Sequence, residues 1–419
     1  MRNEAHETAV AQIRTAMITF ALFMIREIYC KLNSILGNPL LVERISDRIY
    51  SDKLQKTDLT EVEIKLAESI FDEQRECRIK AKKKLPTWIL NQCLFASVPL
   101  EQCTSEATAR AKASLFSGDT LLSITGGLGV DDAAFSGTFA SVISLDPDAA
   151  LNSVVRFNNM KLGLTNIDRL DSTAEAFLQT NTGTWSCIYA DPDRRASGSR
   201  SAGNVHNYAP DVISLYKTFK NKAPRWLIKL SPMTDLSWFE QEINHPVSFY
   251  IFSHKGEVKE ILAVLHDSGI SEKTIVSAGN GDTLIFREGE SLEISRTDQE
   301  IFCEITSAGI KAGFRDSIIQ ASGLVPASRH GYYLRGNSLI PDTLGRVFNL
   351  KHCLQGSLAE IAKQLSEMSI TQAHINTRDF ILPADETRKK LKIRDGGDIY
   401  LFFTGKDKVK SCFVTEKRA

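Results

Sequence analysis

A cluster of glycines after an apolar run is the first feature of this sequence that could do chemistry. Residues 120–124 are mostly apolar and lead directly into Thr125-Gly126-Gly127-Leu128-Gly129. Glycine lets a chain turn sharply and lets a ligand approach the backbone closely. A helix that begins just after such a turn offers N–H groups that have no partner within the helix. The order strand, glycine turn, helix therefore predicts a ligand-binding loop built by Thr125, Gly126, Gly127 and Gly129.

An acidic residue follows the next apolar run. Val142–Leu145 is predicted to be a strand, and Asp146 stands at its carboxyl end. Ligands of open α/β sheets bind at that end, where a carboxylate can accept both hydroxyls of a ribose. The alternative is a helix cap, because Asp followed by Pro147 is a common helix start. The glycine loop upstream favours ribose binding by Asp146. Asp171, further along the chain, is expected to bind an adenine amine.

The loop favours a nucleoside that carries no phosphate. A dinucleotide site prefers a third glycine in the position that Asp132 occupies here. A carboxylate at the helix start would repel a pyrophosphate bound to the same helix. S-adenosylmethionine has no phosphate and tolerates this charge. The pattern therefore favours S-adenosylmethionine, and an NAD-dependent oxidoreductase is the weaker alternative.

A second candidate site follows the apolar run Trp185–Ala190, which ends in Asp191-Pro192, with Arg194 and Arg195 close behind. In methyltransferases that act on exocyclic amines, an Asp/Asn-Pro-Pro-aromatic turn follows the fourth strand, and its oxygens accept the amine protons. This chain keeps the Asp-Pro pair and lacks the aromatic residue. An ordinary Asp-Pro turn is the alternative. We expect Asp191 and Pro192 to face the methyl acceptor, and Arg194 and Arg195 to steer a phosphate.

Two basic runs could bind RNA phosphates. One contains Lys80, Lys82, Lys83 and Lys84, and the other contains Arg388, Lys389 and Lys390. A run of like charge is more often a solvated helix face. Several lysines and arginines on one surface can also neutralise nucleic-acid phosphates. We expect both runs to contribute to one RNA-binding surface.

A parallel α/β sheet would position these residues. From residue 119, short apolar runs alternate with helical segments, as in such a sheet. The expected strands are Thr120–Ile124, Val142–Leu145, Thr165–Asp168, Trp185–Ala190 and Trp226–Leu230, and the main helices are Ala149–Lys161 and Asp211–Lys220. Val247–Ser253 and Val258–His266 are predicted to form an antiparallel pair that closes the sheet. Five parallel strands plus this pair form a Rossmann-like methyltransferase sheet, and Rossmann dehydrogenases lack the pair.

The flanking segments have other patterns. Residues 1–84 are predicted to be helical. Within them, Ala16–Tyr29 is apolar but too short to cross a membrane, so we expect a buried helix and no membrane partner. Thr274–Arg296 is predicted to form short strands around a hairpin turn at residues 279–282. The last part is predicted to be another α/β unit that begins with the helix Ser357–Met368.

Composition narrows the class of protein. The chain has 419 residues, with 51 basic and 51 acidic side chains. This balance argues against a polycation and leaves room for local basic patches. The eight cysteines form no CxxC pair, which argues against a structural zinc site and a disulfide framework. We therefore expect no metal, and a reducing cytoplasmic location.

Several motifs together resemble one family. They are Lys83–Trp88, Glu101–Glu106, Thr125–Asp131, Asp191–Arg195, Lys229–Asp235, and Arg388–Lys392 with Asp395–Leu401. Together they resemble bacterial class I S-adenosylmethionine-dependent methyltransferase-like proteins with a THUMP-like C-terminal domain. The resemblance implies a methyltransferase domain, a small ferredoxin-like segment, and a THUMP-like end that suggests RNA. We expect the boundaries 1–84 (helical), 85–275 (methyltransferase), 276–325 (ferredoxin-like) and 326–419 (THUMP-like).

The chain departs from that family at two places. Ser123 stands where the family usually has Asp, and Ser253–Glu257 differs from the common run. A serine hydroxyl can still accept a hydrogen bond, but without the charge it contributes roughly 1 kcal/mol less. We therefore expect a methyltransferase whose acceptor is RNA, with a base amine favoured. The alternative is a catalytically degenerate RNA-binding module that keeps the methyltransferase fold.

Overall fold

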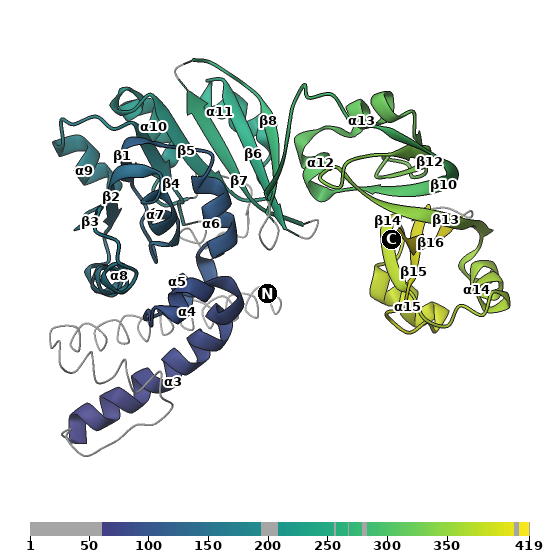
Figure 1. Ribbon diagram of the computed structural model, residues 1–419, viewed down its shortest axis with the longest axis horizontal. Coiled ribbons are helices and arrows are strands. Elements are labelled where there is room, and N and C mark those ends of the chain that lie inside the picture. Colours follow the sequence, from purple (N-terminus) through teal and green to yellow (C-terminus); the bar gives the residue numbers. More distant parts are fainter. Residues whose placement is uncertain are drawn as a thin grey trace, which may run out of the picture. The chain divides into compact units, whose positions relative to one another are not determined.

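A computed structural model describes residues 61–193, 208–254, 257–266, 268–278, 283–405 and 410–418, the first twelve of them by backbone only (Figure 1). The predicted helix Ala16–Tyr29 and the candidate residues Arg194 and Arg195 lie outside the described residues. Contacts divide the chain into two compact units, Met1–Val247 with Ala263–Ile270, and Ser248–Leu262 with Ser271–Ala419. No described helix is both long and apolar enough to cross a membrane.

The described part begins with helices that join the core of the first unit. They are α3 (Glu61–Lys84), α4 (Pro86–Leu90), α5 (Ser97–Gln102) and α6 (Glu106–Ala113). Helix α3 ends just before Leu85 and Pro86, because the residue before a proline is disfavoured in helical geometry. Trp88 and Phe95 are buried in one cluster with Leu128 and Val155. These helices therefore pack against the segments that flank the glycine loop.

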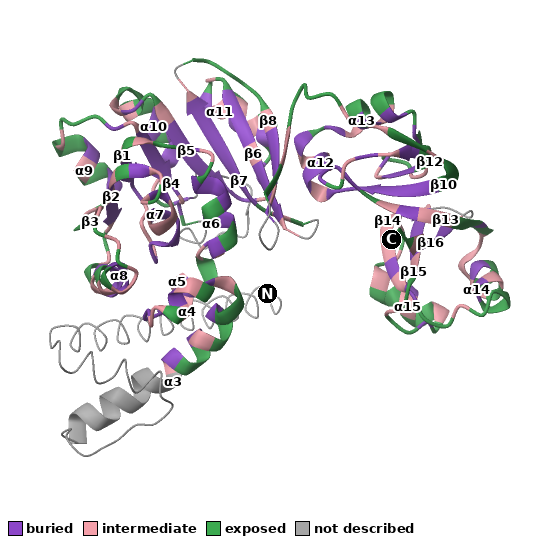
Figure 2. Cartoon of the chain, in the orientation of Figure 1, coloured by how far each residue is buried: buried purple, intermediate pink, exposed green. Residues whose placement is uncertain are grey.

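Five parallel strands form one side of the first sheet, with β3 at its edge, and the sequence predicts all five. They are β1 (Gly118–Ser123), β2 (Phe139–Asp146), β3 (Ile167–Asp171), β4 (Cys187–Ala190) and β5 (Arg225–Leu230), in the order β3-β2-β1-β4-β5. Figure 2 shows nearly continuous burial along β4 and β5, which fits their apolar sequences. The strand order reverses between β1 and β4, and ligands of open α/β sheets bind at the carboxyl ends beside such a reversal.

Helices connect these strands. They are α7 (Val130–Phe135), α8 (Ala149–Lys161), α9 (Ala174–Thr180), α10 (Val212–Phe219) and α11 (Leu236–Ile243). The side chain of Asp148 caps α8 by accepting hydrogen bonds from the backbone N–H groups of Ala150 and Leu151, both at 3.0 Å. Asp211 caps α10 in the same way. These caps satisfy N–H groups that a helix start otherwise leaves unpaired.

The first sheet extends further than expected. Strands β6 (Val247–His254), β7 (Glu257–His266), β8 (Lys273–Ala278) and β9 (Thr283–Arg287) complete the order β3-β2-β1-β4-β5-β7-β6-β8-β9. The pair β6 and β7 was expected to close the sheet, but β8 pairs in parallel with β6, and β9 pairs antiparallel with β8. The buried residues Ile275 and Val276 favour this extension, because they cover apolar surface beside β6. The expected hairpin thus forms the sheet edge.

The second sheet lies in the second unit. Its strands are β10 (Ser295–Ile305), β11 (Val325–Pro326), β12 (Tyr333–Leu339), β13 (Gly345–Gly356), β14 (His374–Phe380), β15 (Ile399–Gly405) and β16 (Lys410–Lys417), in the order β11-β12-β10-β13-β16-β15-β14. Its helices are α12 (Ser307–Ala312), α13 (Arg315–Ser322), α14 (Leu358–Glu367) and α15 (Ala384–Leu391). The expected boundary at 325/326 lies inside β11, and β10 pairs with both β12 and β13. Strands on both sides of that boundary thus belong to one sheet.

Candidate active site

The glycine loop has the geometry that its sequence predicts. Gly127 and Gly129 both have positive φ angles, 50° and 83°, which L side chains rarely adopt. The backbone N–H of Gly126 donates to the carbonyl of Leu145 at 2.7 Å. The N–H of Gly127 donates to the carboxylate of Asp146 at 2.9 Å. Hydrogen bonds therefore tie the loop to the end of β2.

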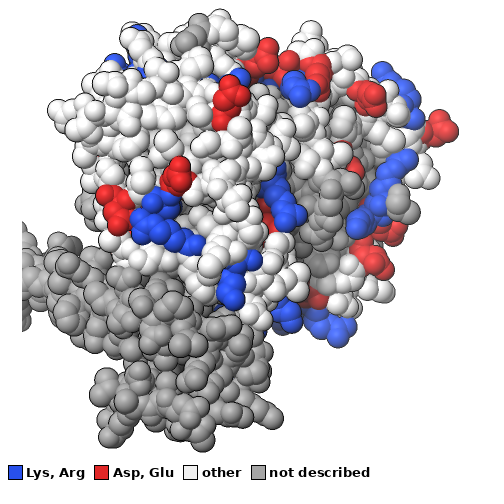
Figure 3. Space-filling view, turned by 60° about the vertical axis from the view of Figure 1, so that its left-hand side comes forward, with Lys and Arg blue, Asp and Glu red and all other residues white. Residues whose placement is uncertain are grey.

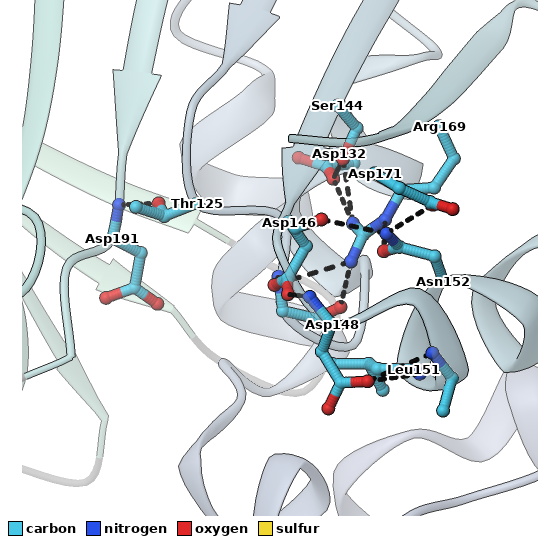
Figure 4. Close-up of polar contacts among 12 residues, drawn as sticks. Thr125, Asp132, Ser144, Asp146, Asp148, Leu151, Asn152, Arg169, Asp171 and Asp191 are labelled. Carbon is cyan, nitrogen blue, oxygen red and sulfur yellow. Dashed lines mark hydrogen bonds and ion pairs between the residues drawn. The ribbon is translucent and has the colours of Figure 1, made fainter. Parts of the chain in front are cut away.

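The buried side chain of Arg169 supports the glycine loop through hydrogen bonds. The guanidinium of Arg169, in β3, donates to the Ser144 hydroxyl at 2.8 Å, to the Gly127 carbonyl at 2.7 Å and to Asn152 Oδ1 at 2.6 Å. Figure 4 shows this guanidinium among the side chains of the second and third strands and of α8. A Cβ atom at Gly126 would lie 1.8 Å from Arg169 Nη1. Glycine is therefore required at position 126 while Arg169 holds its place.

Two carboxylates share the charge of this arginine. Asp132 and Asp146 each have an oxygen 3.5 Å from a guanidinium nitrogen of Arg169. Burial raises the pKa of both carboxyls, and the charge of Arg169 opposes that rise. Asp132 also accepts a short hydrogen bond from Ser144 and is only 2% exposed. Its charge is thus compensated within the protein, which weakens the expected repulsion between Asp132 and a pyrophosphate.

The helix-cap interpretation of Asp146 is wrong, because Asp148 caps α8. One Asp146 oxygen accepts from Gly127 N, and the other accepts from Asp148 N at 2.9 Å. Asp146 lies directly across from Asp171 in the pairing of β2 with β3. Each carboxylate oxygen can accept more than one hydrogen bond. Two acidic side chains therefore stand together at the carboxyl edge, beside the glycine loop.

Two side chains of α8 fix the position of the Asp171 carboxylate. Its carboxylate accepts hydrogen bonds from Asn152 Nδ2 and Arg156 Nη2, both at 2.7 Å. Although burial alone would raise it, these hydrogen bonds and the Arg156 charge together lower the pKa of Asp171. The side chain is nearly half exposed. It is therefore an ionised, accessible acceptor, as an amine-binding role requires.

The Asp-Pro turn is connected to the glycine loop. The backbone N–H of Asp191 donates to Thr125 Oγ1 at 2.5 Å (Figure 4). One Asp191 carboxylate oxygen lies 2.7 Å from Lys229 Nζ, on β5. Burial raises the pKa of Asp191, and the Lys229 charge opposes that rise. Pro192 is buried. The side chain that was expected to face an acceptor is therefore partly engaged by a lysine.

Lys229 belongs to a buried polar network around Asp131. Its ammonium also donates to Thr104 Oγ1 at 2.8 Å, and Thr104 donates to Asp131 at 3.0 Å. The fully buried Lys112 and the hydroxyl of Tyr189 donate to the same carboxylate at 2.9 and 2.7 Å. Although burial alone would raise it, the charges of Lys112 and Lys229 lower the pKa of Asp131 to about 2.

No sequence pattern indicates a role for Arg169, Lys112, Tyr189 or Lys229. Lys229 lies in one of the motifs shared with the resembled family, which was the available signal. Ser123, at the position where that family has Asp, is fully buried, so its hydroxyl is not presented to solvent. The described site thus depends on buried charge pairs that no local pattern indicates.

The basic runs have local partners. Lys80 pairs with Glu101 at 2.7 Å, and Lys84 donates to the carbonyls of Leu100 and Glu101. Arg388 pairs with two aspartates around α15. The exposed members of the two runs are Lys80, Lys82, Lys83, Lys389 and Lys390. The described surface seen in Figure 3 carries basic and acidic side chains interspersed. The runs lie in different units, so a shared surface stays a prediction.

Comparisons with known proteins agree with this architecture. Residues 345–417 match the THUMP domain-like family model. Two relatives from Mycobacterium tuberculosis strains CDC 1551 and H37Rv, both named uncharacterized S-adenosylmethionine-dependent methyltransferases, are 24% identical over 346 residues, covering 79% of this chain and 90% of each relative. A crystal structure of a proposed methyltransferase from Porphyromonas gingivalis is similar at a TM-score of 0.74, with 23% identity over 94% of this chain and 98% of the other. The chain has a class I methyltransferase-like fold with a THUMP-like C-terminal domain.

In this methyltransferase-like fold, Gly126→Ala should destabilise the first unit. The added methyl would meet Arg169 and, at 2.5 Å, Ser144, and three hydrogen bonds keep the guanidinium from moving. We expect a loss of about 1–3 kcal/mol in the free energy of unfolding. Gly137→Ala is the matched control, because its nearest atom would be 3.4 Å away. Urea denaturation measures both, and equal midpoints would contradict the packing argument.

Asp131→Asn should also destabilise the methyltransferase-like unit, because Lys112 would keep a buried charge without its nearest carboxylate. Removing one partner of a buried pair costs about 3–5 kcal/mol. The double variant Lys112→Met/Asp131→Asn should recover part of that loss. Chemical denaturation of both single variants and the double variant gives the coupling energy. Simple additivity of the single effects would show that the pair does not interact.

Proposed function

We propose that this chain is an S-adenosylmethionine-dependent methyltransferase whose acceptor is RNA, with a base amine as the reacting group. The observation that carries the proposal is the pair of carboxylates, Asp146 and Asp171, at adjacent strand ends beside a glycine loop. The relatives named as S-adenosylmethionine-dependent methyltransferases support the class of enzyme and its cofactor.

The residues at the carboxyl edge fit S-adenosylmethionine. A Cβ atom at Gly127 would meet nothing within 4 Å, so the loop borders open space. Asp146 would accept the ribose hydroxyls, and Asp171 would accept the adenine amine. Thr125, Gly126, Gly127 and Gly129 would shape the methionine end. These roles need hydrogen-bond acceptors and a backbone that the ligand can approach closely. The two carboxylates supply the acceptors, and the glycine loop supplies the accessible backbone.

The chemistry is an in-line displacement, in which positioning contributes most of the catalysis. Bound S-adenosylmethionine supplies an electrophilic methyl group on sulfur. The attacking base amine would give up a proton, which Asp191 would hold. Lys229 engages one oxygen of Asp191, and the other oxygen can accept an amine proton. Burial raises the pKa of Asp191, which makes its carboxylate a stronger base. Pro192 restricts the backbone beside it.

RNA is proposed as the acceptor on two grounds. Residues 345–417 match a THUMP domain-like model, and exposed lysines stand in both basic runs. The degenerate binding-module alternative is less well supported, because Asp146, Asp171 and Asp191 all keep ordered partners. The cytoplasmic location stays a prediction from the cysteine spacing of the sequence.

Asp146→Ala should weaken S-adenosylmethionine binding by about 2–4 kcal/mol, because two hydrogen bonds to a charged acceptor are lost. Asp148→Ala is the matched control. It removes the cap of α8 and should cost about 0.5–2 kcal/mol of stability while the affinity stays the same. Titration calorimetry measures the affinities. Unchanged binding by the Asp146 variant would exclude a ribose role for this residue.

Asp191→Ala should leave cofactor binding near normal and slow methyl transfer at least about 100-fold, roughly 2.7 kcal/mol of transition-state stabilisation. Asp193→Ala, in the same turn, is the control and should retain activity. Single-turnover transfer of a labelled methyl group to bulk RNA is the measurement. Equal transfer by the wild type and the Asp191 variant would mean that this turn does not hold the acceptor. No transfer by either protein, with cofactor bound, would favour the degenerate alternative.

A further inference from the structure

Lys229, near the end of β5, connects two carboxylates of the first unit. Its ammonium lies 2.7 Å from one oxygen of Asp191 and donates to Thr104 Oγ1 at 2.8 Å. The Thr104 hydroxyl donates in turn to Asp131 at 3.0 Å. Because a hydroxyl has one proton, and this one is given to Asp131, its oxygen can only accept from Lys229. The direction of each hydrogen bond in this chain is therefore fixed.

The surroundings of Lys229 keep its ammonium in place. Its side chain is only 8% exposed. Asp131 also accepts from the fully buried Lys112 and from the Tyr189 hydroxyl, at 2.9 and 2.7 Å. Buried charges need partners in good geometry, because leaving one unpaired is costly. Movement of the ammonium toward solvent would break its contacts with this network, so the network holds Lys229 beside Asp191.

Asp191 is fixed at two points and still reaches solvent. Its backbone N–H donates to Thr125 Oγ1 at 2.5 Å, and its carboxylate points away from Thr125 (Figure 4). Lys229 donates to the Oδ2 atom of that carboxylate. The side chain is 28% exposed, which makes it more open than Lys229. Its other oxygen can therefore accept a hydrogen bond from a ligand.

The ionisable groups of the network act on Asp191 with different signs. Burial raises the pKa of Asp191, and the charge of Lys229, on β5, opposes that rise. Asp131 on α7 raises this pKa, and Lys112 on α6 lowers it, so these two effects oppose each other. Tyr189 on β4 donates to Asp131. Lys229 is therefore the group whose loss changes the ionisation of Asp191 most.

We propose that Lys229 is a positioning residue for methyl transfer, an inference that rests on the proposed function. Lys229 keeps the Asp191 carboxylate ionised in its buried setting and leaves the second oxygen to face the acceptor. An ionised carboxylate accepts hydrogen bonds and donates none. The site therefore selects an acceptor that presents N–H groups, such as an exocyclic base amine, over a base that presents a carbonyl oxygen there.

Carbon-13 NMR of the whole chain, labelled at the aspartate carboxyls, measures the ionisation of Asp191 without any methyl transfer. The resonance of Asp191 is identified by its absence in Asp191→Asn. Lys229→Met should raise the titration midpoint of Asp191 by about 1–3 pH units, because an opposite charge in contact is removed. Lys217→Met is the matched control, since it removes an exposed ammonium whose partner is Glu242, and it should leave the midpoint unchanged. An unchanged midpoint in the Lys229 variant would overturn the proposal.

The pH dependence of transfer separates positioning from a purely structural role. In a single turnover with bulk RNA, Lys229→Met should be at least about tenfold slower than the wild type near pH 6 and should recover most of that loss near pH 9, where Asp191 is ionised again. Calorimetry should give an affinity for S-adenosylmethionine close to that of the wild type. A loss of the same size at both pH values would count against the positioning role.

Thr104→Val is the second variant, for the case in which Lys229→Met does not fold. It keeps the charges of Lys229 and Asp191 and removes the hydroxyl that aligns the ammonium. It should slow transfer about tenfold at both pH values, as expected for a lost hydrogen bond to a charged group, with thermal unfolding recorded to confirm the fold. Wild-type transfer by the folded variant would contradict the alignment. An active wild type with an unchanged Asp191 midpoint in Lys229→Met would overturn the role of Lys229 alone, whereas no transfer by the wild type would overturn the proposed function as well.

Discussion

The guanidinium of Arg169 is the interaction on which the candidate site depends. It is buried between the glycine loop and α8, where it compensates Asp132 and Asp146 and holds the Gly127 carbonyl. A buried cation of this kind is stable only if its hydrogen-bonding groups are satisfied. The loop conformation and the place of the carboxylate proposed to bind the ribose therefore follow from one side chain on β3. The requirement for glycine at position 126 has the same origin.

A second buried network organises the other side of the site. Asp131 lies between two lysines, and Lys229 extends the network to Asp191 at the Asp-Pro turn. The carboxylates of Asp131 and Asp191 balance the ammonium charges of the two lysines in a largely buried region, where unpaired charges would be costly. This network links the helices before β1 to β4 and β5. It gives a physical reason why residues so distant along the chain stand at one edge of the sheet.

The strand predictions succeeded where local pattern is sufficient. Apolar runs such as 120–124 form buried parallel strands because both faces of such a sheet are covered. At the sheet edge, the predicted strands β8 and β9 are present, but pattern did not indicate that they extend the sheet beyond the closing pair. It also missed that β10 pairs across the expected boundary near residue 325. Pairing between strands depends on surfaces that the chain brings together only on folding.

The sequence by itself determined the glycine loop, the acidic residues at the strand ends and the Asp-Pro turn, because each needs only local geometry and the rule that ligands bind at the carboxyl edge. Only the tertiary structure decided what those residues contact. Arg169 meets Gly127, and Lys229 meets Thr104, through contacts between segments far apart along the chain. Such pairs carry no periodic signal, since their energy comes from burial and charge compensation in three dimensions.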